Sequence, residues 1–486
     1  MVSKRARANN TVGTRLAAVQ AGMEELQART RTPAPDTTPE RLEVVERRLE
    51  LLSSANYRAE EDLLVRGSDY AHGLLDPAYI GPGPARVSFL PDGTLSDDPY
   101  EWRGDFYPWG NRVVNMIRID GRWFIDGHTS QSMDALTGIG RGGIVKLDLL
   151  NGWQNYSQYT GSFQYAEAQA QRLHSGIVVL SGLIGNGTIT SGTVIATLPP
   201  SMRPDTDLLL PTLNGNNYRS LTISANGDIV VRGGWIASFI TLDGIAFPAQ
   251  GTATWTEIGA AGSGSSYANG WTNYDTNPIW GKAAYWKDPY GLVWFRGLID
   301  NGTRGTDDTT MVNLPATHRA HMQQHNNVVA SDTFGFVGTR TTGGIDWKAG
   351  TGGGWHSLAS LRIITSDALT ASPWWTPVYS GGWLDYNVAQ FTSLGLTRRP
   401  DGLGLSKGLA KSGSLGAGTR LTTAPRHMLP AMTWLTPRVS GQVAARMDMY
   451  GHKGLSTGTL PGQISPNFGA ASWFSLDGMV WMIGEL

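Results

Sequence analysis

Hydrophobic residues follow a helical spacing in the first 58 residues and a strand-like alternation in much of the rest of the chain. Near the N-terminus, apolar positions step by three and four residues, which is the spacing of a heptad seam between helices. The two seams comprise Leu16, Val19, Met23 and Leu26, then Leu42, Val45, Leu49 and Leu52. Prolines between them break the helix. The pattern predicts a helical coiled-coil segment over residues 1–58, interrupted at 30–39.

Each seam spans only about two heptads, fewer than the three to four that usually define a coiled coil. The same positions would also suit two ordinary amphipathic helices that pack on a globular core. A coiled coil here would need support from the domains behind it, because helices this short are marginal alone. The seams do not by themselves distinguish two strands from three.

A linker over residues 59–82 and a small β domain over residues 83–147 are predicted next. Residues 113–119 alternate between apolar and polar, Asp120-Gly121 is typical of a hairpin turn, and residues 122–125 form the return strand.

The C-terminal two-thirds of the chain carries the same landmarks three times, in the same order. These are a tryptophan, a strand and turn, a proline, and an aromatic residue followed three positions later by leucine. Copy by copy they are Trp153, residues 182–188, Pro199 and Phe239/Leu242; Trp271, residues 297–303, Pro315 and Trp355/Leu358; and Trp383, residues 408–414, Pro425 and Trp473/Leu476. A repeat of this length exceeds a solenoid unit and has the size of a domain.

We therefore predict three tandem domains, at residues 148–250, 267–366 and 378–486. In copy one, 177–183 reads as a strand, Asn186-Gly187 as a turn and 188–198 as the return; residues 222–231 form a second hairpin. Short strands at this spacing favour antiparallel β-sandwich-like repeats, and the recurring tryptophans favour a shared core position. Small-residue linkers at 259–266 and 368–380 suggest domains strung in a row. The fold class is mainly β behind a short coiled coil.

Composition limits the possible partners. The net charge is −1, so nothing attracts the chain as a whole to nucleic acid or to an anionic membrane. No run of 18 apolar residues is present, which argues against a transmembrane helix. The lack of cysteine excludes disulfides, thiol catalysis and cysteine-bound metals.

The sequence contains no convincing catalytic or cofactor motif, and we predict that the protein is not an enzyme and holds no cofactor. An acidic cluster (Asp97, Asp98, Glu101 and Asp105) could seat acid–base chemistry, but a solvated turn explains it as well. His318, His321 and His325 would share a helix face suited to a metal, whereas on a strand His318 and His321 would point to opposite faces. Metal binding there is left open, and no metal site is assigned.

Aromatic residues that do not recur between copies are the best candidates for ligand contact, because exposed rings stack on sugar faces. They are Trp280, Tyr285, Trp286, Trp374 and Trp375. Trp374 and Trp375 follow a proline in a predicted linker, where burial is less assured.

The repeat motifs resemble the C-terminal domain of phage tail fibres and minor tail proteins, which are frequent in phages of actinobacteria. The resemblance rests on the Gly-Leu-Ile strand, the Asn-Gly-Thr turn, and the segments ATLPPSMRP (196–204) and FITLDGIAF (239–247). It covers residues 150–486 well and the N-terminal layout in general terms. Copy three departs most, with Ala424 before its proline and Ser-Gly in its turn.

This resemblance implies a virion tail protein, in the distal or baseplate region, that forms a homotrimer. Its N-terminus, with basic Lys4, Arg5 and Arg7, would dock on a neighbouring tail protein. Because the non-repeating aromatics and the looser linkers accumulate in copies two and three, we expect those copies to bind the host surface, with a glycan as the expected ligand. Two alternatives are a tail-associated glycan hydrolase and a purely structural spacer.

Overall fold

The computed structural model describes residues 70–75, 84–89, 96, 99–102, 112–119, 122–132 and 144–483, with short gaps at 161–163, 174, 237, 275, 306–307, 351–352, 416–418, 426–427, 452–459 and 470–472. The chain divides into two compact units, Met1–Tyr70 and Ala71–Leu486. The predicted coiled coil and both of its seams lie outside the described residues. In the described part, no helix has the length and apolar character needed to cross a membrane.

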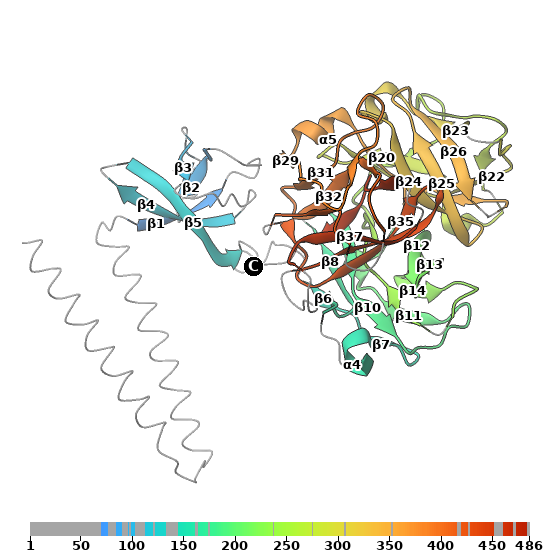
Figure 1. Ribbon diagram of the computed structural model, residues 1–486, viewed down its shortest axis with the longest axis horizontal. Coiled ribbons are helices and arrows are strands. Elements are labelled where there is room, and N and C mark those ends of the chain that lie inside the picture. Colours follow the sequence, from blue (N-terminus) through green and yellow to red (C-terminus); the bar gives the residue numbers. More distant parts are fainter. Residues whose placement is uncertain are drawn as a thin grey trace, which may run out of the picture. The chain divides into compact units, whose positions relative to one another are not determined.

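Strands dominate the described residues, which confirms the mainly β class (Figure 1). The described helices are short: α4 (Tyr156–Thr160), α5 (Ser366–Thr370), and the 3-10 turns η1 (Pro200–Met202), η2 (Pro278–Trp280) and η3 (Ala316–His318).

The first β unit is a five-stranded sheet. Its order is β2 (Val87–Phe89), β1 (Tyr70–Leu75), β4 (Arg112–Ile119), β5 (Arg122–Ser132) and β3 (Glu101–Trp102). The predicted hairpin is confirmed, since Ile119 pairs with Arg122. Its buried core comprises Ala85, Val87, Val114, Met116 and Ile125. Strand β1 lies within the predicted linker, so the sheet begins earlier than the alternation indicated. Its pairing with β2 and β4 is a long-range contact that no local pattern reveals.

Each of the three repeats folds into two sheets with one shared topology. In repeat 1 the large sheet runs β7 (Gln154–Asn155), β10 (Leu183–Gly185), β15 (Ile240–Thr241), β12 (Leu208–Asn214), β13 (Asn217–Ile223), β14 (Asp228–Val231), β11 (Val194–Thr197). The small sheet runs β6 (Val145–Lys146), β8 (Gln169–Arg172), β9 (Ile177–Ser181), β16 (Ala246–Pro248). The predicted hairpin across Asn226-Gly227 is confirmed as β13–β14.

Repeat 2 has the same order with one added edge strand. Its large sheet runs β19 (Thr272–Asn273), β22 (Leu298–Asp300), β27 (His356–Ser357), β24 (Gln324–Ala330), β25 (Thr333–Thr339), β26 (Gly344–Gly350), β23 (Thr309–Asn313), β18 (Ser266–Tyr267). Its small sheet runs β17 (Thr256–Glu257), β20 (Ala284–Lys287), β21 (Leu292–Arg296), β28 (Arg362–Ile364).

Repeat 3 again follows this order. Its large sheet runs β30 (Leu384–Asp385), β33 (Leu409–Lys411), β38 (Trp473–Ser475), β35 (Trp434–Ser440), β36 (Val443–Met449), β37 (Gln463–Phe468), β34 (Thr422–Thr423). Its small sheet runs β29 (Trp374–Trp375), β31 (Gly395–Arg398), β32 (Leu403–Lys407), β39 (Val480–Met482). Corresponding strands in the same order identify three copies of one fold.

The core of each repeat lies between its two sheets, as in a sandwich. In repeat 1, for example, Val178 of the small sheet belongs to the same buried cluster as Leu221 of the large sheet. Repeats 2 and 3 have corresponding clusters. Each repeat begins before its predicted start, with β6, β17 or β29. These strands are two residues long, too short for alternation to reveal.

The recurring glycine of the Gly-Leu-Ile motif is where the chain passes from the small sheet to the large one. Gly182, Gly297 and Gly408 have φ of 130°, 85° and 112°. A side chain at Gly182 would lie 2.7 Å from the Ala168 Cα. Only glycine suits this combination of positive φ and close backbone approach. The prediction that Asn186-Gly187 joins two strands that pair with each other is wrong. Strand β10, before this turn, pairs with β7 and β15, whereas β11, after it, pairs with β14.

The recurring turn has a packing role. Asn186, Asn301 and Ser412 have positive φ, and the glycine that follows each lies against the indole of the recurring tryptophan. A Cβ at Gly187, Gly302 or Gly413 would come within 2.1, 1.9 and 2.0 Å, respectively, of that ring. Trp153, Trp271 and Trp383 are all buried. The expectation that these tryptophans occupy equivalent core positions is confirmed.

Replacing Trp271 with alanine should cost about 3–5 kcal/mol of folding free energy, because it empties a fully packed core site. Chemical denaturation followed by circular dichroism would measure the loss. The control is Leu384→Ala, at a side chain that is 57% exposed, where a change within about 0.5 kcal/mol is expected. Equal effects of the two substitutions would contradict the core assignment.

Candidate functional site

The three repeats are not strung in a row but close on one another. The central strands of the large sheets are β12, β24 and β35. The residue immediately before each of them donates a backbone hydrogen bond to another repeat. The three bonds are Asp207 N to Ile279 O (3.0 Å), Gln323 N to Gln390 O (3.0 Å) and Thr433 N to Gln164 O (2.8 Å). Repeat 1 thus contacts repeat 2, repeat 2 contacts repeat 3, and repeat 3 contacts repeat 1. Such a head-to-tail interface, repeated until it closes, makes a ring.

A second set of bonds closes the repeats in the same cyclic sense. The donors are hydroxyl groups at corresponding positions in β27, β38 and β15, the strands that neighbour the central strand of their own repeat. The acceptors are carbonyls in the central strand of another repeat. They are Ser357 Oγ to Leu209 O (2.7 Å), Ser475 Oγ to His325 O (2.8 Å) and Thr241 Oγ1 to Leu435 O (3.0 Å). We call this arrangement the repeat ring; it corrects the expectation of independent domains.

The repeat ring also has a hydrophobic core that all three repeats share. One buried cluster combines Ile177 of repeat 1, Leu292 of repeat 2 and Leu403 of repeat 3, which occupy corresponding strands β9, β21 and β32. Residues from three repeats meet here because those strands surround the ring's approximate threefold axis.

Two interfaces contain a buried carboxylate. Asp243 accepts backbone hydrogen bonds from Gly182 in its own repeat and Leu435 in repeat 3, both at 2.9 Å. Asp477 accepts from Gly408 (2.8 Å) and from His325 of repeat 2 (3.0 Å). Burial raises the pKa of Asp243 to about 7 and the pKa of Asp477 to about 6. Repeat 2 has Ala359 at the corresponding place, so only two of the three interfaces are joined in this way.

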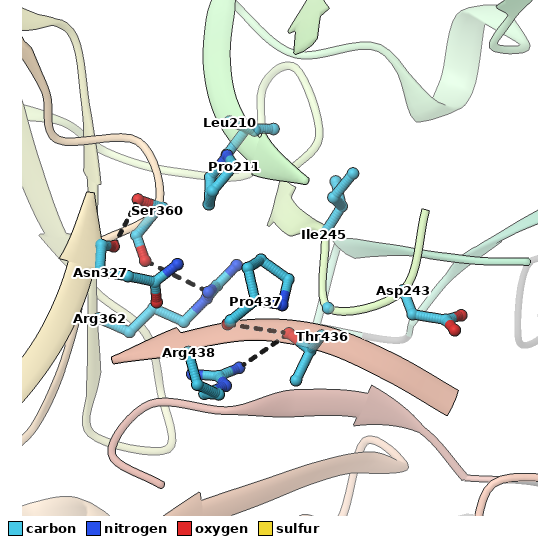
Figure 2. A pocket seen from close by; sticks show the side chains of 11 residues that line it. Leu210, Pro211, Asp243, Ile245, Asn327, Ser360, Arg362, Thr436, Pro437 and Arg438 are labelled. Carbon is cyan, nitrogen blue, oxygen red and sulfur yellow. Dashed lines mark hydrogen bonds between the residues drawn. The ribbon is translucent and has the colours of Figure 1, made fainter. Parts of the chain in front are cut away.

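A pocket lies on the axis, where the central strands of all three repeats approach one another (Figure 2). We call it the axial pocket. It offers about 10 Å³ to the centre of a water-sized sphere, which is room for about one water molecule or one small ion. The lining residues are Leu210, Pro211, Asp243, Gly244, Ile245, Asn327, Ser360, Arg362, Thr436, Pro437 and Arg438.

Two arginines give the axial pocket its charge, and both are more than 90% buried. Arg362 donates to Ser360 O (3.3 Å) and to Ala246 O (2.8 Å). Arg438 donates to Asp477 O (3.4 Å) and to Thr436 Oγ1 (3.2 Å). Burial lowers the pKa of Arg362 to about 10. Burial, together with the neighbouring Arg362, lowers the pKa of Arg438 to about 9.

These charged residues break the internal symmetry of the ring, and neither belongs to a sequence motif noted above. Where repeat 2 has Arg362, repeats 1 and 3 have Ala246 and Val480. Where repeat 3 has Arg438, repeats 1 and 2 have Thr212 and Val328. In an alignment of the three copies, each arginine stands opposite two uncharged residues, and this contrast is the signal that the sequence carries.

The predicted contact residues divide into buried and partly exposed rings. Trp280 is buried among Leu209 and Leu298 at the interface of repeats 1 and 2. Tyr285 is 1% exposed in the core of repeat 2, and its hydroxyl donates to Ser263 O (2.8 Å). Neither ring presents a face to a ligand, so both serve packing, which corrects the prediction for these two.

Trp286, Trp374 and Trp375 are partly exposed. Trp374 and Trp375 form β29, an edge strand rather than the predicted linker. The Trp374 indole donates to Ala368 O (3.1 Å), and Lys407 Nζ lies 4.8 Å from its ring centroid. Trp375 packs partly against the core of repeat 3. These three rings remain candidates for ligand contact.

The three histidines have separate surroundings. His318 packs against Tyr285 at 4.8 Å, and His321 lies between Ile364 O (2.9 Å) and Thr392 Oγ1 (3.2 Å). His325 is enclosed by aromatic rings, and burial lowers its pKa to about 3. Across the described ranges, no group of three potential ligands of the histidine, cysteine or carboxylate type is gathered. Of the acidic cluster, Glu101 alone is described, exposed on β3.

One solved structure shows a weak similarity to this chain. No protein-family model matches the chain, and no curated protein matches it. Among solved structures, the receptor binding protein (gp15) of Listeria phage PSA aligns with 24% of this chain and 70% of its own, at 24% identity and a TM-score of 0.20. An overlap this weak establishes neither the family nor the function.

Asp243 should make stability depend on pH. With its folded pKa raised from 3.8 to about 7, the unfolded chain releases this proton first, so stability should fall as pH rises from about 4 to about 7. Asp243→Asn should flatten that slope, and Asp477→Asn should flatten it only up to about pH 6. Urea denaturation across this range measures the slopes. If the slope of Asp243→Asn equals that of the native chain, Asp243 is already ionised in the folded protein over this pH range and its pKa is not raised.

Proposed function

We propose that this chain is a phage tail protein, of the tail-fibre or minor-tail type, that attaches to the virion through its N-terminus and binds the bacterial surface through its C-terminal repeats. The observation that carries the proposal is the repeat ring: three copies of one β-sandwich, closed about a common axis by corresponding bonds. The tail-protein motifs quoted above lie in these same copies. The proposed location is the tail, in its distal or baseplate region.

A ring of related domains supports adhesion by multivalency. Corresponding loops of the three repeats are held at fixed separations, because the repeats share buried bonds and an apolar cluster. A cell-wall glycan presents the same unit many times along one polymer. Weak sites held at fixed separations act together as a strong one, provided that they can engage simultaneously. The ligand class proposed is therefore a host-surface glycan, with stacking on partly exposed rings.

The N-terminal segment is proposed to assemble copies of the chain and to dock on other tail proteins. The repeat ring supplies a threefold arrangement from one chain, so trimerisation is not needed to build it. A homotrimer formed through the seams would carry three such rings and would raise avidity further.

Adsorption of the labelled full chain to actinobacterial cell walls tests the binding role. We expect saturable binding, and we expect Trp375→Ala to weaken it by about 0.5–1.5 kcal/mol, the usual contribution of an aromatic contact. Leu384→Ala, at an exposed apolar site in the same repeat, is the control and should bind normally. Glycan length after incubation should be unchanged. Shortened glycan would favour the hydrolase, and no adsorption across a host panel would favour the spacer.

The oligomeric state can be measured directly. Light scattering at micromolar concentration should give three times the chain mass of 52.4 kDa. Replacing Leu16 and Leu49 with glutamate should reduce the mass to that of a single chain, because charge in a heptad seam opposes helix association. A monomeric native chain would end the homotrimer proposal and leave the repeat ring intact.

A further inference from the structure

The axial pocket brings together two cations from different repeats, Arg362 of β28 and Arg438 of β35. Each has a buried Nε–H group that finds no hydrogen-bond partner. A buried donor without a partner costs about 1–3 kcal/mol, and more when the group is charged. Because both side chains line one pocket, a single acceptor placed there would lie close to both of them.

The surrounding acids do not neutralise these charges. Among the described residues, no carboxylate lies within the 4 Å of a salt bridge to either guanidinium. Asp243 also lines the pocket, but its carboxylate points away from the two arginines (Figure 2). Asp477 reaches Arg438 through its backbone carbonyl, and its own carboxylate accepts hydrogen bonds from Gly408 and His325. Arginine stays protonated at neutral pH, so two positive charges remain at the axis.

The fold does not require these charges. Corresponding positions in the other repeats carry Ala246 and Val480, or Thr212 and Val328, and the same sandwich forms around them. The remaining walls combine the apolar side chains of Leu210, Pro211, Ile245 and Pro437 with the uncharged polar side chains of Asn327, Ser360 and Thr436. Unpaired buried charge is expensive, whereas charge paired with a counter-ion is not.

We propose that the axial pocket binds a small inorganic anion between Arg362 and Arg438, which links repeats 2 and 3 at the axis against a wall formed by repeat 1. The anion accepts hydrogen bonds from the unpaired Nε–H groups and cancels the repulsion between the guanidinium groups. A water molecule could accept the same bonds but would leave the repulsion in place. The anion is thus a structural ligand of the repeat ring, whatever surface the ring binds.

Stability of the full chain under different anions tests this. Thermal unfolding is measured at constant ionic strength while sodium chloride replaces sodium gluconate, a bulky reference salt. A ligand of the folded state stabilises it by RT ln(1 + [L]/Kd), so the midpoint should rise with chloride and keep rising with its logarithm above Kd. In parallel, the ³⁵Cl NMR line of chloride should broaden in the presence of the native chain. A second series with phosphate identifies an oxyanion occupant if phosphate raises the midpoint at lower concentration.

Variants assign the effect to the pocket. Arg438→Val introduces the residue that repeat 2 has at this position, and Arg362→Val introduces that of repeat 3. Either should abolish the anion-dependent rise and the line broadening, and should raise the midpoint in gluconate above that of the native chain. The control, Arg219→Val, removes an arginine whose guanidinium donates at the surface to Gly234 O (2.6 Å) and should keep the full response.

Two results would overturn the proposal. One is that the unfolding midpoint of the native chain responds to neither chloride nor phosphate and its presence does not broaden the ³⁵Cl line. This result does not depend on any variant folding. The other is a response that persists unchanged in both arginine variants, which would place the bound anion elsewhere.

Discussion

Closure of three β-sandwiches about one axis is the constraint on which the rest of this structure depends. The residue before each central strand donates its backbone N–H to another repeat, and one carbonyl of the strand accepts a hydrogen bond from the same neighbour. Every interface therefore uses the same two surfaces. Such an interface is satisfied throughout only when the ring closes, since an open array would leave one strand and one loop unpaired. Closure also buries apolar strands β9, β21 and β32 against one another. An isolated repeat would expose these surfaces to water.

The common fold of the repeats makes their differences informative. Three copies share the Trp–Gly contact, the sheet-switching glycine and the interface hydroxyl, which are the features that build a sandwich and join it to the next. Charge is distributed unequally. Asp243 and Asp477 occupy two interfaces and Ala359 the third, while Arg362 and Arg438 each occur in one copy. The fold does not need these charges, and burying a charge is costly. Charged residues that occur in only one or two copies are therefore candidates for a specific role.

The repeat ring changes what trimerisation would mean for this protein. A threefold set of binding surfaces is present in one chain, so N-terminal association would multiply rings instead of assembling one. Covalent linkage between the copies also allows each to evolve its own surface, which identical subunits cannot do. The partly exposed Trp286, Trp374 and Trp375 belong to repeats 2 and 3 and have no tryptophan counterparts in repeat 1. Under the proposed function, the ring would present three different surfaces to the bacterial cell wall at fixed separations.

The sequence by itself determined the β class, the number of repeats and the positions of their tryptophan cores. Those properties depend on local alternation, turn chemistry and recurrence, all of which are visible along the chain. It did not determine that the strands on either side of Asn186-Gly187 pair with other strands and not with each other, that two-residue strands such as β17 and β29 begin the copies, or that Tyr285 is core. Nor did it show the ring, in which residues far apart, such as Ser475 and His325, are bonded. Only the tertiary structure decided these points, because pairing between distant strands and the burial of a single ring or charge depend on neighbours that no local pattern specifies.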